Sequence, residues 1–210
     1  MLYQQRSRPS PTDLAEWCQR LAALGYVQVR TSAVAGGTAS ALEAAGFTVM
    51  QELVLLEHTN VRRAATAFTA TMDVPSTSRL LATQRRAASR IDDAAFGREW
   101  ALDDVALHDV CAATPRYRAR AAGDPLAGYA ITGRDGRQGF LQRLAVHPEA
   151  QRHGLGLALV ADSLTWMARW RVERALVNTP SGNEGALALY ERAGYLRLPD
   201  ALSVYERSLV

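Results

Sequence analysis

A short stretch near residue 150 constrains the fold of this chain more than any other feature. Val146, His147 and Pro148 close a run of alternating apolar residues, and Gln151-Arg152-His153-Gly154-Leu155-Gly156 then leads into a long apolar helix pattern. In a strand, turn and helix arranged in this order, backbone N–H groups at the helix start have no helical partner and attract anions. The two glycines keep side chains out of that approach. The sequence therefore predicts a phosphate-binding turn within an α/β domain.

A second block follows one predicted strand later. This block places a polar amide and a phenol on a second predicted helix. It consists of Asn183, Leu189, Tyr190, Gly194 and Tyr195. Together, the two blocks predict a site that holds a pyrophosphate-bearing molecule and donates a proton at its far end.

Hydrophobic periodicity divides the rest of the chain into alternating elements. The residues Ser10-Pro11-Thr12-Asp13 predict a helix start, with a hydroxyl cap and a proline in the first turn, and this helix continues to Leu24. Further helices are predicted over residues 38–45, 84–96, 154–171 and 184–193 and within 97–113. Strands are predicted over 26–32, 47–57, 116–121, 125–132, 138–146, 174–178 and 202–208, with a hairpin turn at 133–136. Residues 60–78 have no clear period and are predicted to be a connection with room for the first strand of the main domain. Hairpins followed by alternating helices and strands predict an α/β fold with a mixed, mostly antiparallel sheet flanked by helices.

Residues of roughly 12–57 look like a degenerate copy of the C-terminal elements. Leu42-Glu43-Ala44-Ala45-Gly46-Phe47 has the pattern of Tyr190-Glu191-Arg192-Ala193-Gly194-Tyr195, and a predicted strand precedes both. The copy has Ala35 in the place of Asn183 and Leu42 in the place of Tyr190, and no glycine-rich turn precedes it. We therefore expect a non-catalytic N-terminal half repeat over residues 1–60 and the main domain over residues 61–210.

Composition limits the partners and the cellular compartment that we expect for the protein. All 24 basic residues are arginine and most are scattered, so a net charge of +3 and a pI of about 9.1 do not by themselves indicate nucleic-acid binding. No apolar run predicts a membrane span, and residues 1–11 lack an apolar signal core. Cys18 and Cys111 lie far apart, which favours reduced thiols in a cytoplasmic protein. We expect no metal site, nucleic-acid partner or membrane partner.

The two blocks resemble the signatures of the GCN5-related N-acetyltransferase (GNAT) family. The first signature, Q/R-x-x-G-x-G/A after a strand that ends in V-x-P, is complete from Val146 to Gly156. The second, N-x-x-A-x-x-L-Y-x-x-x-G-F, stands from Asn183 to Tyr195. The resemblance covers about residues 79–208. It implies the GNAT fold, acetyl-CoA as co-substrate and, because relatives often dimerise, a homodimer as a family-level expectation.

The resemblance also implies roles for particular residues. The backbone of residues 144–146 would pair with the pantetheine amides like an added strand, the amides of residues 151–156 would hold the pyrophosphate, and Asn183 would steady the pantetheine arm. The cofactor-binding residues expected on this basis are Leu144, Ala145, Val146, Gln151, Arg152, His153, Gly154, Leu155, Gly156 and Asn183.

Tyr190 is the catalytic residue that the resemblance implies. It would sit near the sulfur, and a phenol with an ordinary pKa of about 10 can protonate a departing thiolate. The implied mechanism is direct transfer, in which an amine attacks the thioester carbonyl and a strand amide stabilises the oxyanion. Neither motif contains a cysteine, so an acyl-enzyme route is not expected.

The acceptor side departs from the family at Gln142. Many relatives carry Glu on this strand, and a primary amide cannot accept a proton at neutral pH. Gln142 is expected on the same face as Phe140 and Leu144. Glu99, Asp103 and Asp104 fall in the region that lines the acceptor site in relatives, either as surface charges or as the base, and water-mediated deprotonation is an alternative to all three. The candidates for the acceptor site are Phe96, Glu99, Trp100, Tyr117 and Gln142, with core packing as the other role for the aromatic residues.

The sequence therefore favours an acetyl-CoA-dependent N-acetyltransferase acting on a primary amine of a small molecule or on a protein N-terminus. A module that binds acyl-CoA as a sensor without catalysis is the alternative from another class, motivated by Gln142. The presence of Tyr190 argues against the sensor. The acceptor, the general base and the role of the half repeat stay open at this stage.

Overall fold

The computed structural model, which describes residues 9–71 and 74–210, divides into two units. The smaller unit comprises Met1–Leu55, Asn178–Glu184 and Arg197–Val210, and the larger unit comprises Leu56–Val177 and Gly185–Leu196. Residues from both ends of the chain thus share the smaller unit. The division into a half repeat over 1–60 and a main domain over 61–210 remains a prediction.

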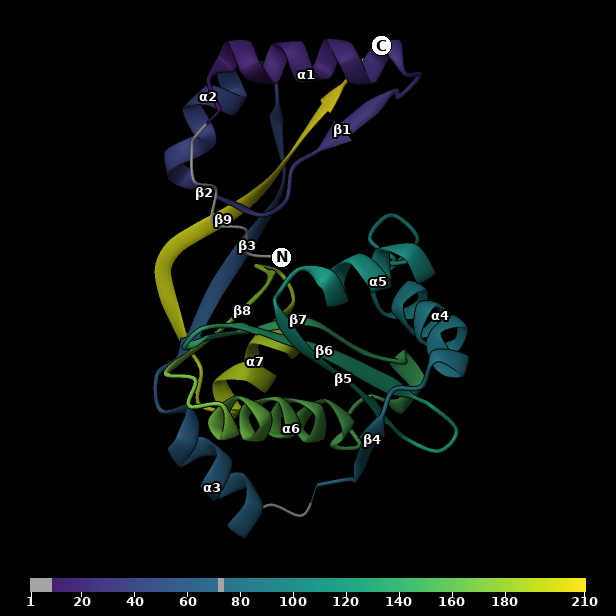
Figure 1. Ribbon diagram of the computed structural model, residues 1–210, viewed down its shortest axis with the longest axis vertical. Helices are drawn as coiled ribbons and strands as arrows, with labels where there is room; N and C mark the ends of the chain where they lie inside the picture. Colours follow the sequence, from purple (N-terminus) through teal and green to yellow (C-terminus); the bar gives the residue numbers. More distant parts are fainter. Residues whose placement is uncertain (1–8, 72–73) are drawn as a thin grey trace. The chain divides into compact units, whose positions relative to one another are not determined.

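The smaller unit combines two helices with strands from the beginning and the end of the chain (Figure 1). Its elements are α1 (Pro11–Ala23), β1 (Gln28–Arg30), β2 (Val34–Ala35), α2 (Ala39–Ala44) and most of β3 (Thr48–His58) and β9 (Leu196–Ser208). β1 pairs antiparallel with the end of β9, where Gln28 lies opposite Ser208, and β2 pairs with an earlier part of the same strand. The C-terminal strand is therefore an integral part of this unit.

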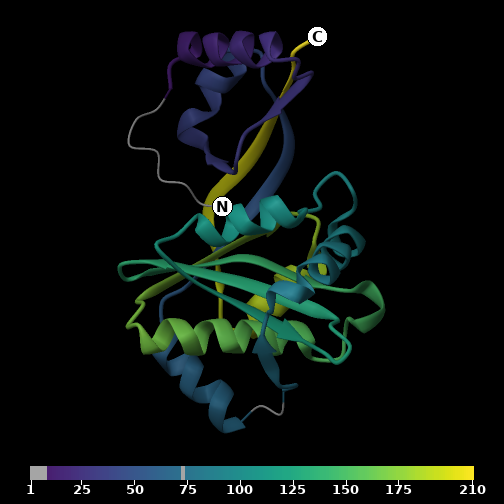
Figure 2. The same ribbon diagram turned by 45° about the vertical axis from the view of Figure 1, so that its right-hand side comes forward.

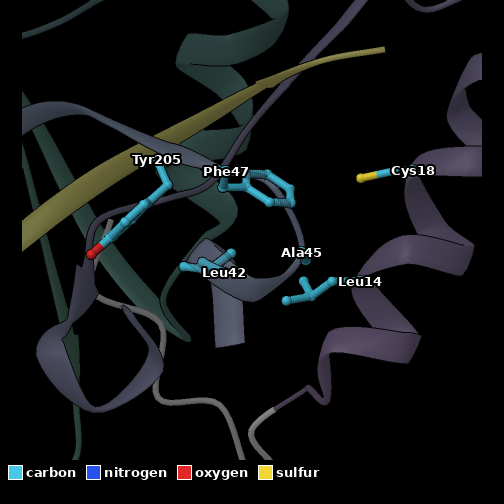
Figure 3. Packing of buried hydrophobic residues seen from close by; sticks show 6 residues of the cluster. All are labelled: Leu14, Cys18, Leu42, Ala45, Phe47 and Tyr205. Carbon is cyan, nitrogen blue, oxygen red and sulfur yellow. The ribbon is translucent and has the colours of Figure 1, made fainter. Parts of the chain in front are cut away.

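The core of the smaller unit is a cluster of six buried residues. Figure 3 shows its side chains, which come from α1, from α2 and the turn that follows it, and from β9: Leu14, Cys18, Leu42, Ala45, Phe47 and Tyr205. Helix α1 begins where the sequence predicts, because Ser10 and Asp13 form a capping box: Ser10 Oγ accepts from Asp13 N at 3.2 Å, and the Asp13 carboxylate accepts from Ser10 N at 2.9 Å.

The larger unit is built on a mixed, mostly antiparallel sheet with the strand order β8-β7-β6-β5-β4. Its elements are α3 (Val61–Thr71), β4 (Thr77–Arg79), α4 (Arg85–Phe96), α5 (Asp104–Ala112), β5 (Arg116–Ala122), β6 (Gly128–Asp135), β7 (Gln138–Val146), α6 (Leu155–Arg169), the first part of β8 (Arg174–Pro180) and α7 (Glu184–Arg192). Only β7 and β8 pair in parallel within this set. The predicted fold class is confirmed.

Helices cover both faces of this sheet (Figures 1 and 2). Helices α4 and α5 pack on one face over a buried cluster made of Ala88, Ile91, Leu107, Tyr129, Ile131 and Ala145. Helix α6 packs on the other face, where the Thr132 and Ser163 hydroxyl oxygens lie 2.6 Å apart. On that face Asp162 of α6 also pairs with Arg118 of β5 at 2.8 Å.

A β-bulge interrupts the pairing of β6 with β7. Ile131 lies opposite Arg143 but the next residue, Thr132, lies opposite Leu141, so Gln142 is an extra residue on β7. The bulge turns Gln142 and Arg143 toward the same helices: Gln142 donates to Val110 O of α5, and Arg143 pairs with Asp92 of α4. Since Ala145 also lies on that face, strand alternation places Leu144 on the opposite one. The prediction that Gln142 shares a face with Leu144 is therefore wrong.

Residues 61–71 form a helix that the sequence analysis missed. The apolar positions Val61, Ala65 and Phe68 are all buried and follow helical spacing. The intervening Thr and Ala residues weaken this period, which explains the prediction of a connection. The first strand expected near the end of that segment is present as β4. The hairpin turn lies later than predicted, since β6 continues to Asp135 and pairs there with Gln138.

No helix in the described part of the chain is long and apolar enough to cross a membrane. Over the same residues, no group of three or more His, Cys, Asp or Glu side chains is placed to hold a metal ion. Cys18 and Cys111 are free thiols.

Candidate cofactor and acceptor site

Strand β7 is paired with β8 over only the first part of its length. Among the described residues, its parallel pairing with β8 runs only from Gln138 opposite Arg174 to Phe140 opposite Leu176. On its other edge β7 stays paired with β6 as far as Val146. Because His147 N donates to Ala127 O of the segment before β6, alternation directs the backbone groups of Leu144 and Val146 to the β8 side and those of Ala145 to β6. The backbone of Leu144 therefore offers a donor and an acceptor to an extended ligand on the β8 side, as an unpaired strand edge does.

The turn after β7 presents backbone N–H groups at the start of α6. Arg152 and Gly154 have φ values of +67° and +80°, and residues 151–154 are exposed. Gly154 is the N-cap residue and has no side chain with which to cap the helix. The first N–H groups of a helix have no intrahelical partner. Alternating left- and right-handed conformations form a concave anion-binding nest. The donor set fits a pyrophosphate group.

The side chain of Gln151 reaches back to the end of the strand. Its Nε2 donates to Val146 O at 3.2 Å, which ties the turn to the end of β7. The backbone N–H of His147 donates in addition to Ala127 O at 2.8 Å. These two bonds fix the direction in which the chain leaves the strand and enters the nest.

Gly156 allows helix α7 to approach the start of α6. A Cβ atom at this position would lie 3.1 Å from Leu189 Cδ2, closer than ordinary van der Waals contact. Leu189 precedes Tyr190 on α7. The second glycine of the motif therefore has a packing role that positions the helix carrying the predicted acid.

Tyr190 is buried, with 5% of its surface exposed. Its ring centroid lies 5.9 Å from that of Tyr195, which in turn makes an edge-to-face contact with His58. Burial raises the pKa of the Tyr190 phenol above its ordinary value, and the positive charge of Arg143 partly offsets that effect. The phenol is therefore protonated at neutral pH and can act as a proton donor.

Asn183 belongs to the smaller unit and lies in the connection between β8 and α7. Its side chain is exposed, and its backbone N–H donates to Pro180 O at 2.9 Å in a tight turn. The role predicted for Asn183 on the pantetheine arm remains a prediction.

Two of the aromatic acceptor candidates are brought together by Arg143. The guanidinium carbon of Arg143 lies 3.6 Å from the ring centroid of Phe96, and its Nη2 donates to Trp100 O at 2.8 Å. Tyr117 lies on β5 with half of its surface exposed, and Glu99 is exposed in the loop after α4. The structure therefore groups Phe96, Trp100 and Gln142 around Arg143, on the face of the sheet covered by α4 and α5.

Sequence reasoning missed the residue that organises this group, Asp92. Its carboxylate is fully buried and accepts hydrogen bonds from Arg143, from Tyr129 and from the backbone of Leu102. One signal was available, because Asp92 follows Ala88 and Ile91 on the apolar face of α4. A charged residue on an apolar helix face implies a buried partner.

Asp103 and Asp104, two of the three carboxylates proposed as the base, are both placed at the start of α5. Asp103 caps α5, since its Oδ1 accepts from Ala106 N at 2.8 Å, and Asp104 occupies the first turn of the same helix. Cys111 is half-buried, and burial raises its thiol pKa, which disfavours a nucleophilic thiolate.

Gln142 has a structural reason to be an amide. Its Nε2 donates to Val110 O at 3.0 Å, and its Oε1 is buried without a partner among the described residues. We expect Gln142→Glu to lower the free energy of unfolding by about 1–3 kcal/mol at pH 8, because the carboxylate loses the donor and buries an unpaired charge. Urea unfolding measures the effect. It should shrink at pH 5 as the new carboxyl takes up a proton, and a loss independent of pH would contradict this account.

The model of the Acetyltransferase (GNAT) family matches residues 85–195, which is more than half of the chain. No curated protein matches the sequence.

Solved structures share the fold at low identity. A GCN5-related N-acetyltransferase from Sphaerobacter thermophilus is similar with a TM-score of 0.63 and 16% identity, over 92% of this chain and 65% of that one, so the chain spans just under two thirds of that relative. A tandem GNAT protein from the clavulanic acid biosynthesis pathway gives a TM-score of 0.67 and 14% identity, over 95% and 69% of the two chains. The ribosomal-protein-S18-alanine N-acetyltransferase from Escherichia coli gives a TM-score of 0.53 and 21% identity, over 65% of this chain and 94% of that one.

The matched region contains the α4–α5 face, the bulged strand β7, the glycine-containing turn of residues 151–156 and Tyr190. The chain belongs to the GNAT family of acetyltransferases.

Proposed function

We propose that this protein transfers an acetyl group from acetyl-CoA directly to a primary amine, either of a small molecule or of a protein N-terminus. The observation that carries the proposal is the combination of an open strand edge, an uncapped helix start and a buried, protonated phenol within the region matched by the family. Bound acetyl-CoA would supply the thioester acyl group. The acceptor-side groups would orient the amine.

The cofactor would be held mainly by backbone groups. The β8-facing edge of Leu144, Ala145 and Val146 would pair with the amides of the pantetheine arm, and the N–H groups of residues 151–156 would bind the pyrophosphate. Asn183 would add a side-chain contact to the same arm. Because glycines and backbone amides carry most of this binding, affinity depends on the local backbone conformation more than on charged side chains.

Tyr190 would be the general acid. As the new C–N bond forms and the C–S bond breaks, the departing sulfur takes the proton of Tyr190 Oη. Arg143 would stabilise the phenolate that remains, because its positive charge acts on Tyr190.

Two further functions are needed, which are stabilisation of the oxyanion and removal of a proton from the amine. The bulge would supply the first and solvent the second. Gln142 has no partner residue on β6, so a backbone N–H at the bulge can stabilise negative charge that develops on the carbonyl oxygen. The amine must lose a proton to attack, and Asp103 is already engaged as the N-cap of α5. A water molecule that passes the proton to bulk solvent would take this role.

We also propose that residues 61–210 carry the whole activity and that residues 1–60 are a half repeat without chemistry. Ala35 and Leu42 stand at the positions that correspond to Asn183 and Tyr190. Leu42 is packed into the core of the smaller unit and has no proton to donate. The half repeat would therefore keep the shape of the family without its catalytic groups.

Thiol release from acetyl-CoA tests the proposed function. Purified protein is mixed with acetyl-CoA and a panel of small amines, polyamines, aminoglycosides and peptides with free N-termini, and acetyl-CoA binding is measured in parallel by calorimetry. Release that depends on one class of acceptor supports the proposal and names the acceptor class. Tight binding with no release across the panel would contradict it and would favour a non-catalytic acyl-CoA sensor.

A further inference from the structure

The face of the sheet under α4 and α5 contains a buried ionic hub made of Asp92, Arg143 and Tyr129. Arg143 Nε lies 2.8 Å from Asp92 Oδ1 and Arg143 Nη2 lies 2.5 Å from Asp92 Oδ2, while the Tyr129 hydroxyl donates to Asp92 Oδ1. The Asp92 side chain has no exposed surface, and the Arg143 side chain is 18% exposed. Burial and the Asp92 charge raise the pKa of Tyr129, which keeps it a donor.

The same hub holds the loop that follows α4. Leu102 N donates to Asp92 Oδ2 at 2.7 Å, and Trp100 O accepts from Arg143 Nη2 at 2.8 Å. At the start of this loop, Phe96 packs its ring under the guanidinium. Three points along residues 96–102 are thus fixed to one ion pair, and Arg143 belongs to β7 directly beside the bulge.

The ion pair also connects this loop with the predicted acid. The charge of Arg143 acts on Tyr190, as the pKa of that phenol indicates. A change in the position of the guanidinium would therefore alter its contacts with residues 96–102 and its effect on the pKa of Tyr190. Hydrogen bonds to charged groups in a buried site are strong and directional, which suits a positioning role.

We propose that Asp92 is a positioning residue for acceptor binding, which acts through Arg143 to hold residues 96–102 in the conformation that receives the amine. The inference rests on the proposed transferase function. Asp92 itself has no exposed surface and contacts no substrate. Its effect reaches the acceptor through the ring of Phe96 and the backbone of Trp100.

Two variants separate this role from simple stabilisation. Asp92→Asn leaves the guanidinium of Arg143 without its carboxylate, so we expect a lower Tm. It should also raise the KM for the best amine of the panel by at least about tenfold, with an unchanged KM for acetyl-CoA. The double variant Asp92→Asn/Arg143→Met removes both charges and should recover much of the Tm, because replacing a whole buried pair is less costly than breaking it. Its acceptor KM should stay raised, since nothing holds Trp100 O and Phe96.

The matched control is Asp162→Asn, which breaks the Arg118–Asp162 pair on the opposite face of the sheet. Hydrogen exchange of residues 97–103 should become faster in Asp92→Asn and in the double variant but not in the control. An acceptor KM that returns to the wild-type value together with the Tm, or that never changes in Asp92→Asn, would overturn the inference and leave the proposed function standing. A wild-type protein that acetylates no amine of the panel would overturn the proposed function, and this inference with it.

Discussion

Tyr190→Phe should lower kcat by about 10²- to 10⁴-fold while acetyl-CoA binds with its wild-type affinity. The loss corresponds to the usual contribution of a positioned general acid. The substitution removes only the Oη atom, so the ring keeps its packing in the buried cluster with Tyr195 and His58. Initial rates with the best acceptor and calorimetric titration with acetyl-CoA measure the two quantities separately.

The chain offers a matched control five residues further on, between the end of α7 and the start of β9. Tyr195 Oη is buried and has no hydrogen-bond partner within the described residues, so Tyr195→Phe removes an unsatisfied hydroxyl from the same cluster. Turnover in this control should match the wild type, and its stability should be equal or higher. If both variants lost turnover equally, the acid assignment of Tyr190 would fail, since the defect would then come from the packing of the cluster.

Gly154→Ala should weaken acetyl-CoA binding by at least tenfold, about 1.4 kcal/mol or more. Gly154 has a φ of +80°, and a Cβ atom there would lie 3.3 Å from Pro75 Cδ. An L-residue avoids this conformation at a cost of about 1–2 kcal/mol. The turn would relax and rotate its N–H groups away from the pyrophosphate. Calorimetric titration with acetyl-CoA measures the loss.

Gly25→Ala separates binding from backbone strain. Gly25 has a similar φ of +88°, no atom lies within 4 Å of its missing Cβ, and it belongs to the smaller unit. Both variants should lose similar stability, but only Gly154→Ala should lose affinity for acetyl-CoA. Wild-type affinity in Gly154→Ala would show that the nest does not hold the pyrophosphate.

Local patterns carry enough information to predict much of this fold. The capping box at Ser10 sets the start of α1, and the strand–glycine–helix order after Val146 predicts the arrangement of β7, the turn and α6. These features depend on residues a few positions apart. Their conformations follow from hydrogen bonds and steric limits that the neighbouring residues already determine.

The parts that sequence analysis missed depend on contacts between distant residues. Asp92 meets Tyr129 37 positions later and Arg143 51 positions later, and no local pattern couples them. The bulge at Gln142 shows the same limit, because an extra residue on one strand is defined only by the register of its partner. One added residue in a strand reverses the face on which each following side chain lies. For this reason the prediction that Gln142 and Leu144 share a face of the sheet is wrong.

Transfer of an isotope-labelled acetyl group tests the central claim most directly. The protein is incubated for a single turnover with acetyl-CoA labelled in the acetyl carbons and with the best acceptor of the panel, and both acceptor and protein are analysed by mass spectrometry. The account predicts that the label appears on the amine nitrogen of the acceptor and at no time on the protein. Label on a protein side chain before it reaches the acceptor, or label that stays on CoA with every acceptor, would contradict it.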